Sequence, residues 1–308
     1  MTTTGPGGDA QVMPCDAEGL RRQLVAALGP VAGEDAPLEA RMIVEAATGL
    51  DRTALRLHGA VAVQTAQLAA AQTMLARRLA REPLSQILGS RGFWTLDIDV
   101  TADVLTPRPD TETLIEAMLD FVDADGRGRG YPWRVLDLGT GSGCLPAALL
   151  SELPEARAIA IDRSPAAARV ARRNLDRIAP GRALVVVSDW ASCLAATGCE
   201  AGAFDLILSN PPYIPSGEIR TLDPEVARHE PHLALDGGDD GLVAYRVLAP
   251  GIARLLRPDG FASIEIGLGQ ALDVERLLAD QGLTTSVRND LGHIARCVTA
   301  RHAVSLAA

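Results

Sequence analysis

Residues 135–143 read Val-Leu-Asp-Leu-Gly-Thr-Gly-Ser-Gly, an apolar strand pattern that leads into a loop with glycine at three alternate positions. Glycine lets the backbone of such a loop approach a ligand, and a following helix, expected over residues 147–150, turns its N–H groups toward that ligand. The spacing differs from the dinucleotide fingerprint, and no Gly-Lys-Ser/Thr follows. The stretch therefore predicts a ligand-binding loop at the carboxyl end of a strand, with neither NAD nor a phosphate loop as the first choice.

Two further apolar runs end in side chains that suit a nucleoside. Residues 158–161 lead to Asp162, about 20 residues beyond the glycine loop, where an acidic side chain can bind a ribose diol. Asp162 could instead cap a helix that opens at Ser164-Pro165. Residues 183–187 lead to Trp190, which could flank an adenine or be an ordinary aromatic residue at the rim. Because the carboxyl ends of parallel strands meet at one edge of an open α/β sheet, we expect a binding site there.

Asn210-Pro211-Pro212-Tyr213 follow a fourth apolar run at residues 204–209. The nitrogen of a planar NH2 group is a weak nucleophile, and two acceptors can orient it by each taking one N–H group. The side-chain oxygen of Asn210 and the carbonyl of Pro211 are such acceptors, the prolines stiffen the turn, and Tyr213 can stack on a flat group. A plain proline-rich loop after a core strand is the alternative. The motif predicts a catalytic role for Asn210, Pro211 and Tyr213 in modifying an amide or a base amine.

The combination of these motifs resembles the amino-methyltransferases, which use S-adenosylmethionine to methylate NH2 groups of adenine, cytosine, guanine or glutamine. Other segments resemble those of the HemK/PrmC family, whose members methylate N5 of the glutamine in the Gly-Gly-Gln motif of peptide chain release factors. The segments are Glu-Pro-Leu (82–84), Gly-Ser-Arg-Gly-Phe-Trp (89–94), Leu-Thr-Pro-Arg-Pro-Asp-Thr-Glu (105–112) and Glu-Pro-His-Leu-Ala-Leu-Asp-Gly-Gly-Asp-Asp-Gly-Leu (230–242). The resemblance covers the chain from about residue 38 to residue 298.

The resemblance implies an α/β fold. It is a Rossmann-like class I S-adenosylmethionine-dependent methyltransferase domain, with a mainly parallel seven-stranded sheet and an antiparallel terminal hairpin, preceded by a small helical N-terminal domain. We expect a disordered tail at residues 1–14, a helical substrate-docking domain at 15–89, a hairpin and connecting segment at 90–130, and the methyltransferase domain at 131–308. Helical patterns cover residues 18–28, 37–47, 61–81 and 112–122, one strand of the hairpin should carry Trp94, Leu96, Ile98 and Val100 on one face, and residues 123–130 read as a flexible link.

The resemblance also implies the site residues. The cofactor S-adenosylmethionine is expected to contact Gly139, Thr140, Gly141, Ser142, Gly143, Asp162, Trp190 and Asn210. The substrate glutamine is expected to contact Asn210, Pro211, Pro212 and Tyr213, with Arg108 and Glu112 in the pocket wall. A surface ion pair is the alternative for Arg108 and Glu112. Because the positive sulfur of the cofactor already activates the methyl group, the reaction needs alignment and desolvation, with no metal and no strong base before attack.

The charge distribution favours a protein substrate. The chain carries a net charge of −10, and residues 1–89, with nine acids and eight arginines, contribute only −1 of it. The acidic remainder argues against tight, nonspecific binding to a nucleic-acid backbone, which requires basic surface, although a small local basic patch is compatible with it. The family resemblance implies peptide chain release factors as the partner, and we expect no direct nucleic-acid contact. The alternatives are an amino-methyltransferase acting on a base in DNA or rRNA, and a non-catalytic cofactor-binding scaffold.

The cysteines and the chain start point to the cytoplasm. Five cysteines without a Cys-x-x-Cys pair predict neither a disulfide framework nor structural zinc. Cys144 is interpreted as a small buried residue rather than a nucleophile. His229 and His232 resemble a metal pair, but Pro231 argues against a regular helix that presents both rings. The sequence shows no signal-peptide pattern and no apolar run of about 18 residues, so we expect no membrane span.

Overall fold

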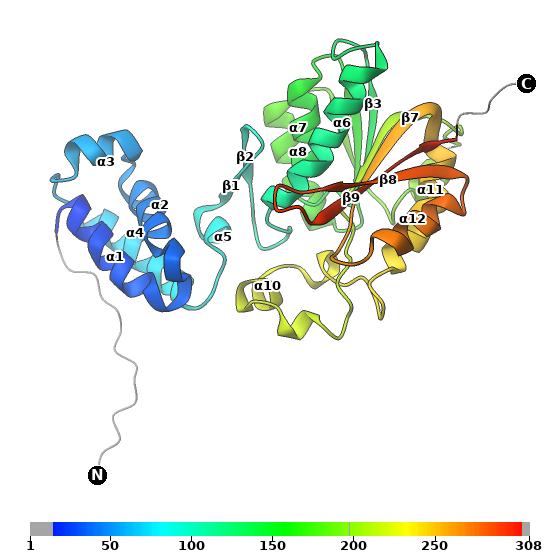
Figure 1. Cartoon of the computed structure of the whole chain (residues 1–308). Helices are drawn as coiled ribbons and strands as arrows, with labels where there is room; N and C mark the ends of the chain where they lie inside the picture. The colour runs from blue at the N-terminus through cyan, green and yellow to red at the C-terminus, as the bar shows by residue number, and fades with distance from the viewer. Residues whose placement is uncertain (1–14, 197, 304–308) are drawn as a thin grey trace, which may run out of the picture. The chain divides into compact units, whose positions relative to one another are not determined.

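The chain divides into two compact units, Met1–Gly89 and Ser90–Ala308 (Figure 1). The computed structural model describes residues 15–196 and 198–303, and the tail expected at residues 1–14 lies outside them. The buried apolar side chains of the first unit form one cluster, and those of the second unit form separate clusters. A unit with its own core has what it needs to fold by itself.

The first unit is helical. Leu20, Leu24 and Leu28 recur at helical spacing on one helix and are fully buried together with Ile43 of the next, as expected for amphipathic helices that share a core. The buried guanidinium of Arg78 pairs with Glu39 at 2.8 Å and joins two of the helices. The elements are α1 (Ala17–Ala32), η1 (Gly33–Asp35, a 3-10 turn), α2 (Ala36–Thr48), α3 (Arg52–His58), α4 (Thr65–Leu79) and α5 (Leu84–Leu88).

Two expected helix boundaries in the first unit are wrong. The helix expected to stop near Gly29-Pro30 continues to Ala32 and ends at Gly33, whose φ is +53°. Proline removes one N–H donor, but its fixed φ suits a helix, and the packing of α1 on α2 holds the last turn. The helix expected over residues 61–81 begins only at Thr65, because the segment before it pairs with the chain preceding α1 through the bonds Val63 N–H to Cys15 O and Ala17 N–H to Val61 O, both 3.1 Å.

The second unit contains a seven-stranded sheet of order β5-β4-β3-β6-β7-β9-β8. Strands β5 to β7 run parallel, and β9 is antiparallel to both β7 and β8. The mainly parallel sheet with an antiparallel terminal hairpin is thus confirmed. The strands are β3 (Arg134–Leu138), β4 (Arg157–Asp162), β5 (Ala183–Val187), β6 (Phe204–Ser209), β7 (Leu256–Glu265), β8 (Leu283–Asn289) and β9 (Ala295–His302).

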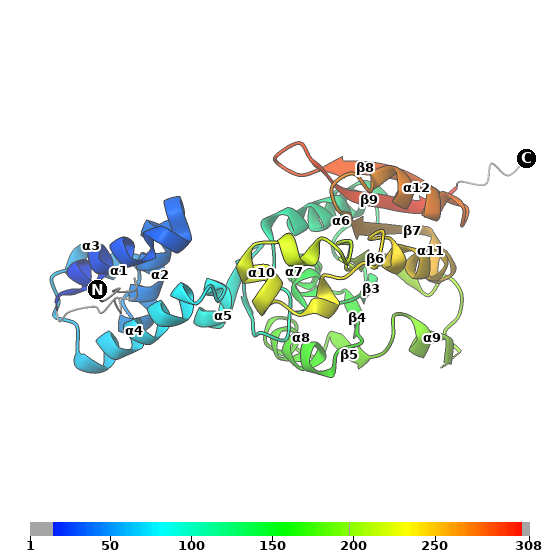
Figure 2. The ribbon, with the colours of Figure 1, turned by 90° about the horizontal axis from the view of Figure 1, so that it is seen from below.

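Helices cover both faces of this sheet. Figure 2 shows α6 (Glu112–Asp125), α7 (Cys144–Glu152) and α8 (Pro165–Ile178) on one face. It shows α9 (Ser192–Ala196), α11 (Val243–Leu255) and α12 (Ala271–Ala279) on the other. The central strand β6 is buried at every position because both of its faces are covered. Short elements lie in the loops: η2 (Pro109–Thr111), η3 (Ile219–Thr221), α10 (Pro224–His229) and η4 (His232–Ala234).

The hairpin at the start of the second unit differs in detail from the expectation. It is formed by β1 (Ser90–Phe93) and β2 (Leu96–Asp99), paired antiparallel. Trp94 lies in the turn between them with φ +57° rather than on a strand face, whereas Ile98 and Val100 are buried as expected. Helix α6 runs to Asp125 and so takes the first residues of the expected flexible link.

The strand order creates the site. Strand β3 lies between β4 and β6, so the chain leaves β3 toward one side of the sheet and later returns to its other side. The loops that follow these strands separate at that point and leave a crevice at the carboxyl edge, where open α/β sheets bind ligands. The glycine loop, Asp162 and Asn210 all lie at this edge, since each directly follows or ends one of these strands.

Candidate active site

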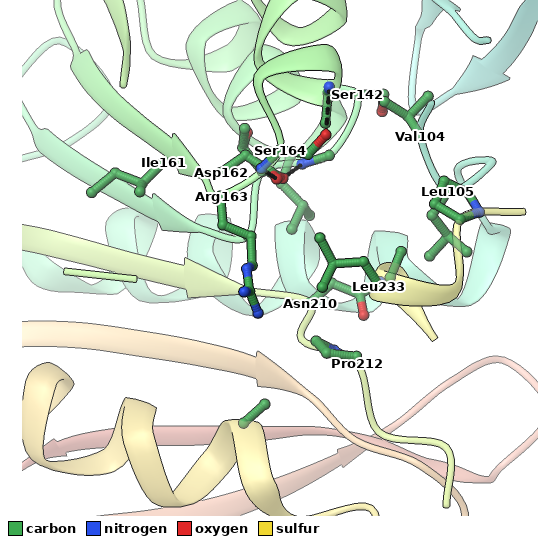
Figure 3. A pocket seen from close by; sticks show the side chains of 18 of the residues that line it. Val104, Leu105, Ser142, Ile161, Asp162, Arg163, Ser164, Asn210, Pro212 and Leu233 are labelled. Carbon is green, nitrogen blue, oxygen red and sulfur yellow. Dashed lines mark hydrogen bonds between the residues drawn. The ribbon is translucent and has the colours of Figure 1, made fainter. Parts of the chain in front are cut away.

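A cavity of about 260 Å³ lies at the carboxyl edge of the parallel strands. Figure 3 shows Asp162, Asn210 and Pro212 around it, with Val104 and Leu105 on another wall. Of the predicted site residues, the cavity is lined by Arg108, Gly139, Thr140, Gly141, Ser142, Asp162, Trp190, Asn210 and Pro212. Four predicted residues lie outside its lining: Glu112, Gly143, Pro211 and Tyr213.

Asp162 holds the glycine loop in place. One carboxylate oxygen accepts from the Gly141 N–H and the other from the Ser164 N–H, both at 2.8 Å. Ser164 itself caps helix α8, because its hydroxyl accepts from the Ala167 N–H at 3.2 Å. The interpretation of Asp162 as the helix cap is therefore wrong. Each carboxylate oxygen has more than one acceptor position, so Asp162 can also receive hydroxyl groups from a ligand in the cavity.

The three glycines of the loop have different surroundings. Gly141 has φ +54°, and a Cβ there would meet no atom within 4 Å, so its backbone is open to a ligand. At Gly139, with φ +80°, a Cβ would lie 3.4 Å from the Trp190 ring, so the indole rests against this turn. At Gly143, also φ +80°, a Cβ would lie 3.1 Å from the Ala171 Cα. Gly143 therefore serves the close packing of the loop on α8.

The Asn210 side chain has a defined orientation. Its Nδ2 donates to the Thr111 hydroxyl at 3.3 Å. In the part of the chain that the structure describes, no donor is bonded to its Oδ1 atom, which leaves that oxygen as an acceptor beside the cavity. This is the acceptor that the Asn-Pro-Pro-Tyr motif was expected to present. Pro211 is buried and lies outside the cavity lining, so its carbonyl as a second acceptor stays a prediction.

Tyr213 turns its hydroxyl away from the cavity. The hydroxyl donates to Glu265 Oε1 at 3.3 Å, and the Tyr213 carbonyl accepts from Gln270 Nε2 at 3.0 Å. Burial, followed by the nearby Glu265 carboxylate, raises the pKa of Tyr213 above its ordinary value. The phenol therefore stays protonated and anchored, and its stacking on a substrate amide stays a prediction.

Arg108 and Glu112 do not pair with each other. Arg108 donates to Glu230 Oε2 at 2.8 Å, and the Thr106 N–H donates to the other oxygen of that buried carboxylate at 3.3 Å. These bonds join two walls of the cavity. Glu112 instead accepts from the Trp94 N–H at 2.7 Å and so supports the turn of the hairpin.

Two buried carboxyl groups beside the site were missed by sequence reasoning. Desolvation raises the pKa of Asp137 to about 7, with the Thr140 hydroxyl opposing the shift. Desolvation likewise raises the pKa of Glu265 to about 7, opposed by the Thr111 hydroxyl and by Arg296. The signal was available, since each is an acidic residue inside an otherwise apolar strand. Desolvation raises the pKa of Cys144 to about 12, which keeps its thiol neutral, but the residue is half-buried and lines the cavity rather than being fully buried as expected.

The chain is similar to known proteins along most of its length. Residues 20–89 match the PrmC N-terminal domain and residues 116–248 the methyltransferase small domain. The release factor glutamine methyltransferase of Rhodospirillum rubrum is 47% identical over 274 residues, which cover 88% of this chain and 81% of that protein. The chain belongs to the release factor glutamine methyltransferase family. The member from Bradyrhizobium diazoefficiens is 41% identical over 287 residues, covering 92% of this chain and 94% of that protein.

Solved structures support the fold of this family member. The hMettl16 catalytic domain in complex with a MAT2A 3′UTR hairpin has a TM-score of 0.50 and 16% identity, covering 81% of this chain and 85% of that chain. At this identity the likeness concerns the fold alone. The family match makes the chain an S-adenosylmethionine-dependent methyltransferase. No helix in residues 15–196 or 198–303 is both long and apolar enough to cross a membrane.

Proposed function

We propose that this chain transfers a methyl group from S-adenosylmethionine to N5 of the glutamine in the Gly-Gly-Gln motif of peptide chain release factors. The observation that carries the proposal is the Asn210 amide. Its Nδ2 is bonded to Thr111, so Oδ1 is the atom it presents beside the same cavity that the glycine loop and Asp162 line. An acceptor in that position can take an N–H group of a substrate amide and orient the nitrogen lone pair.

The residues around the cavity fit the cofactor. Asp162 has acceptor capacity for a ribose diol, and Trp190 offers a flat apolar surface for an adenine. The open backbone at Gly141 admits a ligand that a side chain would exclude. When bound there, S-adenosylmethionine supplies a methyl group on a positive sulfur. The chain's own contribution is to hold the two reactants in line and to keep water out.

Asn210 and Pro211 are the proposed orienting acceptors. Before the reaction the amide nitrogen is a poor nucleophile, and hydrogen bonds from its two N–H groups to Asn210 Oδ1 and the Pro211 carbonyl would direct its lone pair toward the cofactor. As the new N–C bond forms and the bond from the methyl group to sulfur breaks, leaving a neutral thioether, the nitrogen becomes acidic and would give one proton to a nearby acceptor or to water. No base is needed before that point, so no strongly basic side chain is required in the cavity.

The proposed partner is a protein, and the proposed compartment is the cytoplasm. Residues 15–89 form a helical unit with its own core, and we assign them the docking of the release factor. The remaining chain carries −9 of the net charge of −10. Such a surface suits a protein partner better than a phosphate backbone, which requires clustered arginine or lysine.

The test is incubation of the purified chain with labelled S-adenosylmethionine and, in separate reactions, a release factor, rRNA and DNA. Tandem mass spectrometry then locates the methyl group. We expect label in the release factor and a mass increase of one methyl on the glutamine of Gly-Gly-Gln. Label on a nucleic-acid base with none on that glutamine would instead identify a base-modifying enzyme, and cofactor binding without transfer to any of the three would identify a scaffold.

A further inference from the structure

Two incompletely bonded polar groups, Thr111 and Glu265, hold the two ends of the Asn-Pro-Pro-Tyr segment. The Oε2 atom of Glu265 is buried without a hydrogen-bond donor in the part of the chain that the structure describes. The hydroxyl of Thr111 accepts from Asn210 Nδ2, and its own hydrogen has no acceptor among the same residues. The Thr111 hydroxyl lies close enough to Glu265 to oppose the upward shift of its pKa. A buried acceptor without a donor and a neighbouring donor without an acceptor are complementary.

We propose that Glu265 is a positioning residue, which takes the Thr111 hydroxyl hydrogen on Oε2 and thereby sets which end of the Asn210 amide faces the substrate. The inference rests on the proposed function, since it concerns how the amide acceptor of that reaction is held. Once the hydroxyl donates to Glu265, its oxygen can only accept from Asn210. The NH2 end of the Asn210 amide is then fixed on Thr111, and Oδ1 is the end left for the substrate.

Glu265 also holds the other end of the Asn-Pro-Pro-Tyr segment. Its Oε1 accepts from the Tyr213 hydroxyl at 3.3 Å. One carboxylate at the end of β7 thus bonds Tyr213 directly and reaches Asn210 through Thr111. Gln270 adds a third attachment, since its Nε2 donates to the Tyr213 carbonyl at 3.0 Å and its Oε1 accepts from the Gly267 N–H at 2.9 Å. The Asn-Pro-Pro-Tyr segment, residues 210–213, acts as a clamp on the substrate amide in the proposed reaction. This clamp is therefore supported from the segment that follows β7.

The chemistry of this arrangement makes Glu265→Gln informative. Glutamine has nearly the same shape as glutamate, but when its oxygen accepts from Tyr213, its NH2 group points at Thr111. The Thr111 hydroxyl then accepts from residue 265, and its hydrogen, which has lost Glu265 as an acceptor, is free to donate to Asn210. A donating hydroxyl favours the Asn210 oxygen, so the Asn210 side-chain amide would turn over and present its NH2 group to the substrate. This NH2 group would repel the N–H groups of the substrate amide, which should donate to Asn210 Oδ1.

The experiment compares four variants of the full chain with the wild type on a whole release factor. The variants are Glu265→Gln, Thr111→Val, Thr111→Ser and the double variant Glu265→Gln/Thr111→Val. The readouts are kcat, KM for the release factor, S-adenosylmethionine affinity by calorimetry, and the melting temperature. Ser263→Ala is the matched control, because Ser263 is equally buried on the same face of β7 and contacts Cys297 at 3.0 Å rather than the clamp.

We expect kcat to fall on the order of 10-fold to 100-fold in Glu265→Gln, as for the loss of one preorganised hydrogen bond in an active site. Thr111→Val should lose about as much and Thr111→Ser should remain near wild type, because serine keeps the hydroxyl. The double variant should lose no more than its worse single variant, since both changes break one chain of bonds. Cofactor affinity should stay within about threefold of wild type, and Ser263→Ala should keep its kcat.

Several outcomes would overturn the inference. They are a wild-type kcat in Glu265→Gln, losses in the two single variants that simply multiply in the double variant, or a fall in kcat that parallels lost cofactor affinity. If Glu265→Gln does not fold, the comparison of Thr111→Val with Thr111→Ser tests the inference. Equal kcat values for these two variants would refute the role of the hydroxyl. Failure of the wild type to methylate any release factor would instead refute the proposed function.

Discussion

Asp162 ends β4 and Gly141 lies in the loop after β3, yet the Asp162 carboxylate accepts a hydrogen bond from the Gly141 N–H at 2.8 Å. The same carboxylate accepts from the Ser164 N–H, also at 2.8 Å. One side chain thus joins the loop after β3 to the turn that opens α8. The bonds fix the shape of the cavity before any ligand arrives, so Asp162 contributes both to ligand contact and to preorganisation.

Replacing Asp162 tests this double role. Asp162→Ala should weaken S-adenosylmethionine binding about 10-fold to 100-fold, because hydrogen bonds to a charged group contribute about 1.5–3 kcal/mol. It should also lower the melting temperature of the ligand-free chain, since two backbone N–H groups lose their acceptor. Calorimetry and thermal unfolding measure the two effects. Loss of cofactor affinity with an unchanged melting temperature would argue for ligand contact alone.

Replacing Gly141 tests the approach of the ligand to the backbone. Gly141→Val places a branched side chain where φ is +54° and where the space above the backbone is open, so cofactor affinity should fall at least 10-fold through strain and blocked approach. Gly251→Ala is the control, because a Cβ there also meets no atom within 4 Å and its φ is not positive.

Heat of binding to the wild type should persist with a chelator present. Binding that only a divalent cation restores would contradict the proposed mechanism.

Asn210 separates binding from chemistry. Asn210→Ala removes the acceptor that matters most while the amide bonds polarise, so kcat should fall on the order of 100-fold while cofactor affinity changes little. Asn210→Asp keeps an acceptor and should retain more activity than Asn210→Ala. Steady-state kinetics and mass spectrometry of the methylated release factor measure both. A wild-type rate in Asn210→Ala would remove the central support for the proposed reaction.

Asp137 should make stability depend on pH. Burial raises its pKa from the ordinary 3.8 to about 7, so the folded chain binds a proton that the unfolded chain releases. This contribution to the free energy of unfolding is fully present below about pH 4 and is lost as the pH rises through about 7. Chemical denaturation at pH 5 and pH 8 should show that Asp137→Asn gains stability relative to wild type at the higher pH. Asp97→Asn, at an exposed position, should show no such change. If the free energy of unfolding of Asp137→Asn differs from that of the wild type by the same amount at both pH values, the raised pKa of Asp137 would be refuted.

The docking role of the helical unit is tested by removing it. A chain that begins at Ser90 retains both cores that flank the sheet, so it should fold and bind the cofactor with little change in affinity. Its KM for a whole release factor should rise, because contacts with residues 15–89 are gone. A short peptide that carries Gly-Gly-Gln should be methylated equally by both forms. An unchanged KM for the whole factor would show that the helical unit serves another purpose.

Much of the fold and of the site could be predicted because the evidence is local in the sequence. Residues 135–143 contain both the strand pattern and the glycines that its loop requires, and strand β3 and the positive φ of all three glycines bear them out. The order of strands and helices, the antiparallel end of the sheet and the presence of Asn210 at a strand end all follow from the period of apolar residues and from the family resemblance. In the secondary structure, the errors fell at helix ends and in turns such as Trp94, where packing overrides local preference.

The partners of each polar side chain were decided only by the tertiary structure. Nothing near residue 108 in the sequence indicates that Arg108 meets Glu230, and nothing near Asn210 indicates Thr111 or, beyond it, Glu265. These pairs are separated by many residues, and they form because the strand order brings distant loops to one edge of the sheet. The sequence by itself determined the strands, the glycine loop and the Asn-Pro-Pro-Tyr clamp, since these depend on backbone conformation and apolar periodicity. The tertiary structure decided how the clamp is oriented, because hydrogen bonds between buried groups depend on distances that only the folded chain sets.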